Sequence, residues 1–142
     1  ARGLRVSVIK HAHHGFDIDR PGKDSYRHRE AGASEVLLSC NDRWALMHER
    51  RDGSDVTLDD LLARLAPCDL VLVEGFKQEP IPKLEVWRPE NGKPPLFPER
   101  SDIVAVASNV TLATSLPELA LDDVAAIADF VMNTLQLQER PC

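Results

Sequence analysis

The 142-residue chain has only three cysteines, and their spacing suits neither a disulfide framework nor a metal site. Cys40, Cys68 and Cys142 are odd in number and form no CxxC pair. The sequence has no apolar run near the roughly 20 residues that a membrane span needs, no signal-peptide-like opening, no internal repeat and no low-complexity linker. We therefore expect one domain over residues 1–142, in a cytoplasmic protein that contacts no membrane.

Charge, by contrast, is plentiful and unevenly distributed. Residues 1–51 hold ten Lys and Arg against seven Asp and Glu, together with all five histidines, whereas residues 52–142 hold seven against sixteen. Nucleic-acid-binding domains usually carry a basic face over the whole domain, so a net charge of −6 argues against nucleic acid as a partner. A phosphorylated small ligand or an acidic partner fits the weakly basic first third better. Random clustering of solvated charge is the alternative.

Strands and helices are predicted to alternate along the chain, which indicates an α/β fold with a mostly parallel sheet. The β-branched segment Leu4–Ile9 is predicted as a strand buried on both faces. Thr57 with Asp60 forms a capping-box pattern for a helix that ends before Pro67. The other predicted elements are a helix capped by Asp24 or Ser25 and ended by Gly32, the strands Glu35–Ser39, Trp44–Glu49, Asp69–Glu74, Leu84–Trp87 and Ile103–Ala107, and a final helix from about Asp122 with Val124, Ile127, Ala128, Val131 and Leu135 on one face.

The Asn91-Gly92 pair predicts a hairpin turn within the segment Leu84–Phe97. Such a hairpin would project from the domain, and Trp87 and the prolines nearby suit an interface. We expect the protein to be a homodimer, with this segment as a candidate for the contact.

Two predicted strands each end in a polar loop. Ligands of open α/β proteins bind at the carboxyl ends of strands, so the two loops predict two walls of one polar site. The first loop follows Leu4–Ile9, and the second contains the end of DLVLVEGFK. Their polar and small residues are Lys10, His11, His13, His14, Asp17, Asp19, Lys23 and Asp24 in the first, and Glu74, Gly75 and Lys77 in the second.

The carboxylates of these loops are candidate catalytic and metal-binding groups. Glu74 ends an apolar strand as in a Walker B strand, where it can hold Mg²⁺ through water or polarise an attacking water. Asp17, Asp19 and Asp24 are further candidate Mg²⁺ ligands, because Mg²⁺ needs only one or two protein oxygens. The structural alternatives are an ion pair between Glu74 and a nearby lysine, and a helix-capping role for Asp24.

The cations of the first loop are candidate ligand contacts. Lys10 and Lys23 are placed to meet a phosphate, although two solvated lysines would produce the same pattern. His11, His13 and His14 lack a fourth ligand at matching spacing, so a metal site is the weaker interpretation. Neutral imidazoles that contact a small ligand, a phosphate or a partner carboxylate are favoured.

Four blocks of the sequence resemble the MobB family of molybdopterin-guanine dinucleotide biosynthesis adapters. In order, they are KHAHHGFDIDRPGKDSYRHREAGA, SCNDRWALMHE, DLVLVEGFKQEPIPKLEV and IVAVASNV. The resemblance runs from about Leu4 to the last helix. It implies a P-loop NTPase-like three-layer fold and a GTP-binding protein that uses Mg²⁺ with GTP. The implied partners are the molybdopterin guanylyltransferase, which attaches GMP to molybdopterin, and other molybdenum cofactor biosynthesis proteins.

Ser108 and Asn109 acquire a candidate role from this resemblance. In many GTP-binding P-loop proteins the loop after the corresponding strand contacts guanine, so these two residues are candidates for selecting the base. A simple Ser-Asn turn after a strand is an equally economical interpretation.

The chain departs from the family pattern at the phosphate loop. The family opens with a strand, a Walker A loop (GxxxxGK[ST]) and a helix, but Gly22-Lys23 and Gly92-Lys93 are followed by Asp24 and Pro94. A Walker A loop cradles the phosphates with backbone N–H groups. We therefore expect the first βα unit to be missing and the chain to be at most a weak GTPase. A non-nucleotide-binding scaffold and an ATP-dependent kinase or synthetase on the same fold remain alternatives.

Overall fold

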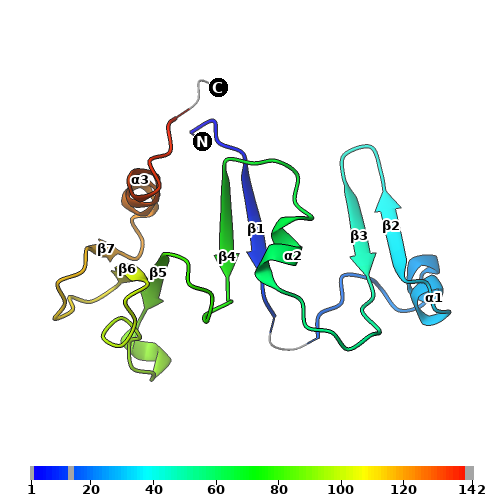
Figure 1. The fold of residues 1–142 in the computed structure, drawn as a ribbon, viewed down its shortest axis with the longest axis horizontal. Helices are drawn as coiled ribbons and strands as arrows, with labels where there is room; N and C mark the ends of the chain where they lie inside the picture. Colours follow the sequence, from blue (N-terminus) through cyan, green and yellow to red (C-terminus); the bar gives the residue numbers. More distant parts are fainter. Residues whose placement is uncertain (1, 13–14, 140–142) are drawn as a thin grey trace. The chain divides into compact units, whose positions relative to one another are not determined.

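The computed structural model describes residues 2–12 and 15–139. These residues form two compact units. The carboxy unit comprises the described parts of Ala1–Ser7, Pro67–Leu72 and Phe76–Cys142, and the amino unit comprises the described parts of Val8–Ala66 together with Val73–Gly75. In chain order the elements are β1 (Val6–Lys10), α1 (Asp24–Glu30), β2 (Glu35–Ser39), β3 (Trp44–His48), α2 (Leu58–Leu62), β4 (Leu70–Glu74), β5 (Lys83–Trp87), the 3₁₀ turn η1 (Pro89–Asn91), β6 (Ile103–Ser108), β7 (Glu118–Ala120) and α3 (Val124–Thr134), as Figure 1 shows.

Strands β1 and β4 pair in a two-stranded sheet and run in the same direction (Figure 1). Side chains alternate between the faces of a strand, and in β1 Ile9 is 7% exposed whereas Val8 is 62% exposed. The prediction that this strand is buried on both faces is therefore wrong. The apolar residues of this segment are compatible with a two-sided core, but they do not show which face of the strand is covered.

Helix α1 ends at Gly32 as predicted, but the residue at its N-cap differs from the prediction. Gly32 has φ +108°, its N–H donates to Arg29 O, and Ala33 N–H donates to His28 O, which is the Schellman pattern. The residue at the N-cap is Lys23, without a side-chain cap, and Asp24 is the first helical residue. The prediction of Asp24 or Ser25 as the cap is therefore wrong.

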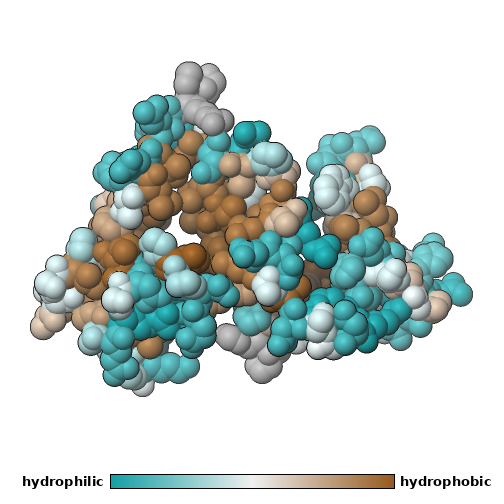
Figure 2. Space-filling model, viewed as in Figure 1, coloured by the Kyte–Doolittle hydropathy of each residue, from teal (hydrophilic) through white to brown (hydrophobic). Residues whose placement is uncertain are grey.

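Strands β2 and β3 form an antiparallel hairpin in which Leu37 pairs with Leu46 and Ser39 with Trp44. Leu37, Leu46 and Trp44 lie on one face of this hairpin and are exposed by 60%, 43% and 68%. Figure 2 shows apolar surface on this hairpin. The opposite face carries Met47, which is 6% exposed and so contributes to the core of the amino unit.

The capping box that precedes α2 is confirmed. Thr57 Oγ1 accepts from Asp60 N–H at 3.1 Å, and the Asp60 carboxylate accepts from Thr57 N–H at 3.1 Å. The helix is shorter than predicted, because it ends at Leu62 and continues only as turns toward Pro67.

The carboxy unit is built on a parallel sheet in the order β5-β6-β7. Its centre is β6, in which Ala105, Val106 and Ala107 are 0% exposed. Helix α3 begins after Asp123, whose carboxylate accepts from Ala126 N–H at 2.9 Å. Met132 is its buried residue, whereas Val124, one of the apolar residues predicted on a common face, is 74% exposed. Strand β7 was not predicted.

The predicted hairpin at Asn91-Gly92 is wrong. Strand β5 pairs in parallel with β6, and the chain between them passes through η1, after which Gly92 adopts φ +64°. Asn-Gly suits a left-handed turn residue in either setting, so the pair alone does not show whether a returning strand follows. Within residues 2–12 and 15–139, no helix is long and apolar enough to cross a membrane.

Candidate functional site

The structure brings Lys10, Glu74 and the backbone of His11 together at the ends of β1 and β4. Lys10 Nζ lies 3.2 Å from Glu74 Oε1, and His11 N–H donates to Glu74 O at 2.8 Å. Both charged side chains are well exposed, at 67% and 66%. For Lys10 and Glu74, the structure agrees with the expectation that the two loops come together at one polar edge. The arrangement offers an ammonium and a carboxylate to an incoming ligand side by side.

Gly75 permits this close approach of the two strand ends. A Cβ at Gly75 would lie 2.7 Å from His11 Cβ, and its φ of +94° is a conformation that other residues rarely adopt. Phe76 follows with φ +48°, which is unusual for a bulky residue. Two successive positive φ values after Glu74 mark a strained strand end of the kind that clusters at functional sites.

Within the carboxy unit, Lys83 holds the segment that follows Lys77. Lys83 Nζ donates to the carbonyl oxygens of Glu79 and Ile81 and, at 2.6 Å, to Asp102 Oδ2. Arg100 donates to both oxygens of Asp102. The hydrogen bonds from Arg100 and then Lys83 hold the pKa of Asp102 far below its ordinary value.

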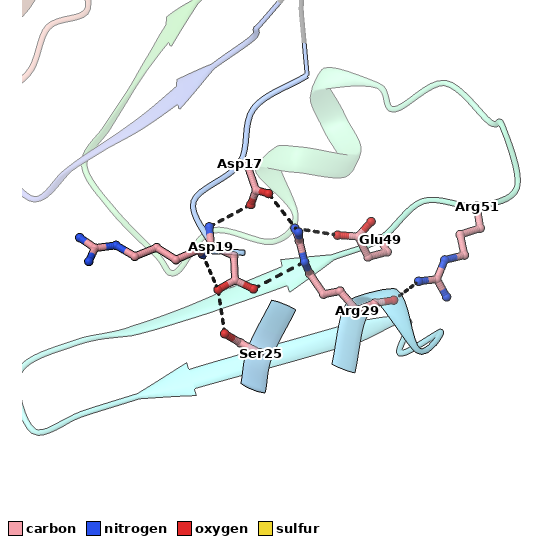
Figure 3. A network of polar contacts seen from close by, with 7 residues as sticks. Asp17, Asp19, Ser25, Arg29, Glu49 and Arg51 are labelled. Atoms are coloured by element: carbon pink, nitrogen blue, oxygen red, sulfur yellow. Dashed lines mark hydrogen bonds and ion pairs between the residues drawn. The ribbon is translucent and has the colours of Figure 1, made fainter. Parts of the chain in front are cut away.

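A second cluster in the amino unit is organised by Arg29 of α1. Its guanidinium lies between the carboxylates of Asp17, Asp19 and Glu49, at 3.1, 3.6 and 3.3 Å, as Figure 3 shows. Asp19 is the least exposed of the three, at 4%. Asp19 also accepts a hydrogen bond from Ser25 Oγ at 2.7 Å. The loop after β1 is thus fastened to α1 and to the end of β3 through one cation.

Hydrogen bonds and neighbouring charges shift the pKa values of Asp17 and Arg29 in this cluster. The pKa of Asp17 is lowered, first by the N–H of Asp19 and then by Arg29. Burial alone would lower the pKa of Arg29, but the hydrogen bond and charge of Asp17 and the charges of Glu49 and Asp19 raise it. Both pKa shifts favour the charged forms of Asp17 and Arg29.

Arg51 adds a second cation at the carboxyl end of α1. It donates to Gly32 O at 2.6 Å and to Arg29 O at 2.8 Å (Figure 3). These two carbonyls belong to the carboxyl end of the helix, where a cation is favourable. The Arg29 guanidinium also lies 5.5 Å from the ring centre of Tyr26.

The carboxylates predicted as Mg²⁺ ligands have partners of their own in the structure. Asp17 and Asp19 contact Arg29, and Asp24 begins α1. In the part of the chain that the structure describes, no group of three or more His, Cys, Asp or Glu side chains is arranged to hold a metal ion. Their roles as Mg²⁺ ligands stay predictions, and Glu74 is the one among them that lies at a strand end.

Of the predicted ligand-contacting cations, His11 and Lys23 lie at the two ends of the loop between β1 and α1. His11 is the first residue after β1, and Lys23 is exposed at the start of α1. His13 and His14 lie outside the described residues. The ligand or partner contacts predicted for these residues stay predictions.

Ser108 and Asn109 end β6 within the carboxy unit. Ser108 is 7% exposed, and its Oγ accepts from Val110 N–H at 3.3 Å. Asn109 is exposed and donates from Nδ2 to Glu90 Oε1 at 3.1 Å. Ser108 therefore shapes the turn, whereas the Asn109 side chain is available at the surface.

The amino unit also contains an open hollow of about 610 Å³ beside Arg29. Its lining combines charged groups, among them Arg29, Glu49 and Arg50, with apolar side chains that include Phe16 and Ile18. Phe16 and Ile18 are exposed by 77% and 63%. Apolar side chains exposed beside charged ones are typical of surfaces that bind a partner.

Fold and strand-end site together define an α/β protein with mostly parallel strand pairing and a charged pair where two parallel strands end. Residues 1–109 match the family described as "Molybdopterin guanine dinucleotide synthesis protein B". The chain belongs to this family, MobB, which confirms the resemblance found in the sequence.

Known relatives agree with that assignment. The molybdopterin-guanine dinucleotide biosynthesis adapter protein of Escherichia coli is 44% identical over 97% of this chain and 81% of its own length. The protein of the same name from Haemophilus influenzae is 47% identical over 95% of this chain and 75% of its own length. A crystal structure of molybdopterin-guanine biosynthesis protein B covers 94% of this chain and 82% of its own, with a TM-score of 0.72 and 24% identity. That structure supports the α/β fold.

Several residues that organise these sites were missed in the sequence. Arg29 is not identified by the sequence, because a lone arginine on a short helix carries no signal for acidic partners in two other segments. Lys83 and Asp102 are 19 residues apart and come together only through the β5–β6 pairing.

Proposed function

We propose that this protein is a cytoplasmic GTP-binding adapter in the biosynthesis of molybdopterin guanine dinucleotide. It assists the guanylyltransferase that attaches GMP to molybdopterin, and it uses Mg²⁺ with GTP. The observation that supports this most is the match to MobB over residues 1–109, together with two relatives above 40% identity that carry the adapter name.

The strand-end pair suits this role chemically. Lys10 supplies a cation for a phosphate, and Glu74 supplies a carboxylate for a hydrated Mg²⁺. Phosphoryl chemistry on such a site depends on positioning and charge more than on covalent steps. Glu74 is exposed and its carboxylate is already paired with Lys10, so no residue of this pair is positioned to activate an attacking water. We therefore expect binding with slow hydrolysis at most.

A titration of the full-length protein tests the nucleotide part of the proposal. Calorimetry with Mg²⁺-GTP, and with Mg²⁺-ATP as the control, is expected to show binding of GTP in preference to ATP. Turnover over hours should stay near the uncatalysed rate. Preferential binding of ATP would contradict the proposal and favour a kinase or synthetase, and binding of neither nucleotide would favour a scaffold.

The adapter role includes self-association. A two-stranded hairpin is only marginally stable by itself, and β2–β3 exposes Leu37, Leu46 and Trp44 on one face. A second copy of the chain would cover this apolar face. Light scattering coupled to size-exclusion chromatography should therefore give the mass of a dimer, and Trp44→Glu should shift it toward the monomer.

A further inference from the structure

The surface beside Asn109 contains a carboxylate that no motif of the sequence identifies. Strands β5 and β6 are parallel, and their register places Trp87 opposite Ser108, so both strands end at the same edge of the sheet. The residues that follow, Glu90 in η1 and Asn109 after β6, are joined by the hydrogen bond from Asn109 Nδ2 to Glu90 Oε1 at 3.1 Å. Carboxyl edges of parallel sheets are where α/β proteins bind ligands.

Local contacts hold Glu90 in place. Trp87 Nε1 donates to Lys93 O at 2.9 Å, which closes the segment that contains η1. Gly92 ends this turn with φ +64° and donates to Pro89 O at 3.0 Å. The pKa of Glu90 is lowered by its own backbone N–H and then by Asn109, so its carboxylate is ionised near neutral pH. Glu90 is thus a fixed and exposed hydrogen-bond acceptor.

Guanine and adenine differ at the edge that such a carboxylate would contact. Guanine presents two adjacent donors there, the N1–H and the exocyclic 2-amino group. Adenine presents an unprotonated N1, whose lone pair would face the carboxylate. A site built to accept from a donor rejects an analogue that lacks the donor far more strongly than an apolar pocket does.

We propose that Glu90 is the residue that selects guanine, with Asn109 as the residue that positions its carboxylate. One carboxylate oxygen takes the N1–H of the base, and the other takes the 2-amino group. This inference rests on the proposed function, since it assigns the group that reads the base of GTP. Exposed Val110, 41% accessible and next to Asn109, offers apolar surface to the face of the base.

Glu90→Gln in the full-length protein tests this assignment, because an amide can donate where the carboxylate only accepts. Calorimetry would compare Mg²⁺ complexes of GTP, ITP, XTP and ATP. The wild type is expected to prefer GTP over ITP, which lacks the 2-amino group, and over XTP, which has a carbonyl at that position. Glu90→Gln should weaken GTP binding by about tenfold or more and improve XTP binding. Asn109→Ala should lower the preference for GTP over ATP without improving XTP binding.

Glu99→Gln is the matched control, because it makes the same chemical change at an exposed carboxylate in the same segment and should leave the base preference unaltered. If Glu90→Gln keeps the wild-type ratio of GTP to XTP affinity, or weakens all four nucleotides equally, the assignment is wrong while GTP binding stands. If the wild type binds GTP and ATP equally, the assignment is also wrong. If the wild type binds no nucleotide, the proposed function itself fails and this inference falls with it.

Discussion

Lys10 and Glu74 occupy the last positions of β1 and β4, with Lys10 Nζ 3.2 Å from Glu74 Oε1. Both side chains are about two-thirds exposed, so water screens their attraction and the pair contributes little to stability. Replacing this ion pair by contacts to a ligand therefore costs little free energy. In the proposed complex with Mg²⁺-GTP, the ammonium would turn to a phosphate and the carboxylate to hydrated Mg²⁺.

Replacing either member of this pair should therefore affect binding more than stability. Lys10→Met and Glu74→Gln are each expected to weaken Mg²⁺-GTP binding by about tenfold, because a charge-assisted contact is lost. The thermal midpoint should change little. Calorimetry and thermal melts measure both effects, and Glu30→Gln, an exposed carboxylate of α1, is the control. A lower melting temperature with unaltered GTP affinity would assign the pair to stability.

Gly75→Ala should destabilise the protein by about 1–3 kcal/mol, because the new Cβ would meet His11 Cβ at 2.7 Å in a backbone with φ +94°. Urea unfolding measures the loss. Gly15→Ala is the control, since nothing lies within 4 Å of its Cβ position. Equal free energies of unfolding for the two variants would contradict the strained geometry at the end of β4.

Arg29→Met should lower the melting temperature by at least several degrees, because it leaves Asp17, Asp19 and Glu49 facing one another without their shared cation. Arg29→Lys should recover only part of the loss, since a point charge does not replace a planar fork. Arg27→Met, at an exposed position of the same helix, is the control. If Arg27→Met is as destabilising as Arg29→Met, the Arg29 cluster does not stabilise the fold.

Acid stability should depend on Asp102. Arg100 and Lys83 lower its pKa below the ordinary 3.8, so this carboxyl contributes stability above about pH 5 that is lost as the pH falls toward the folded pKa. Asp102→Asn should therefore flatten the decrease in unfolding free energy between about pH 5 and pH 2. Urea unfolding at a series of pH values measures the slope. Asp55→Asn, which makes the same chemical change at an exposed carboxyl, is the control.

Local signals in the sequence predict the elements well. The Thr57–Asp60 capping box, the Gly32 helix end and the apolar strand up to Glu74 all depend on residues within a few positions of one another. Such interactions are determined by the chain segment itself. The α/β class follows from their alternation.

Features that depend on distant partners were predicted less well. The exposure of Val8 depends on what covers the second face of β1, and the role of Arg29 depends on three acids from two other segments. The Asn91-Gly92 turn has the same local chemistry in a hairpin and in the observed crossover. In each case the sequence contains the residue type but not the partner, and only the fold supplies it.

The most direct test of the adapter role measures the guanylyltransferase reaction itself. Molybdopterin guanine dinucleotide formation would be followed with purified guanylyltransferase, molybdopterin and limiting Mg²⁺-GTP, with and without the full-length protein. We predict faster formation at low GTP, no stimulation by Glu74→Gln, and convergence of the rates at high GTP. An unchanged rate at every GTP concentration, with no complex between the two proteins, would contradict the account.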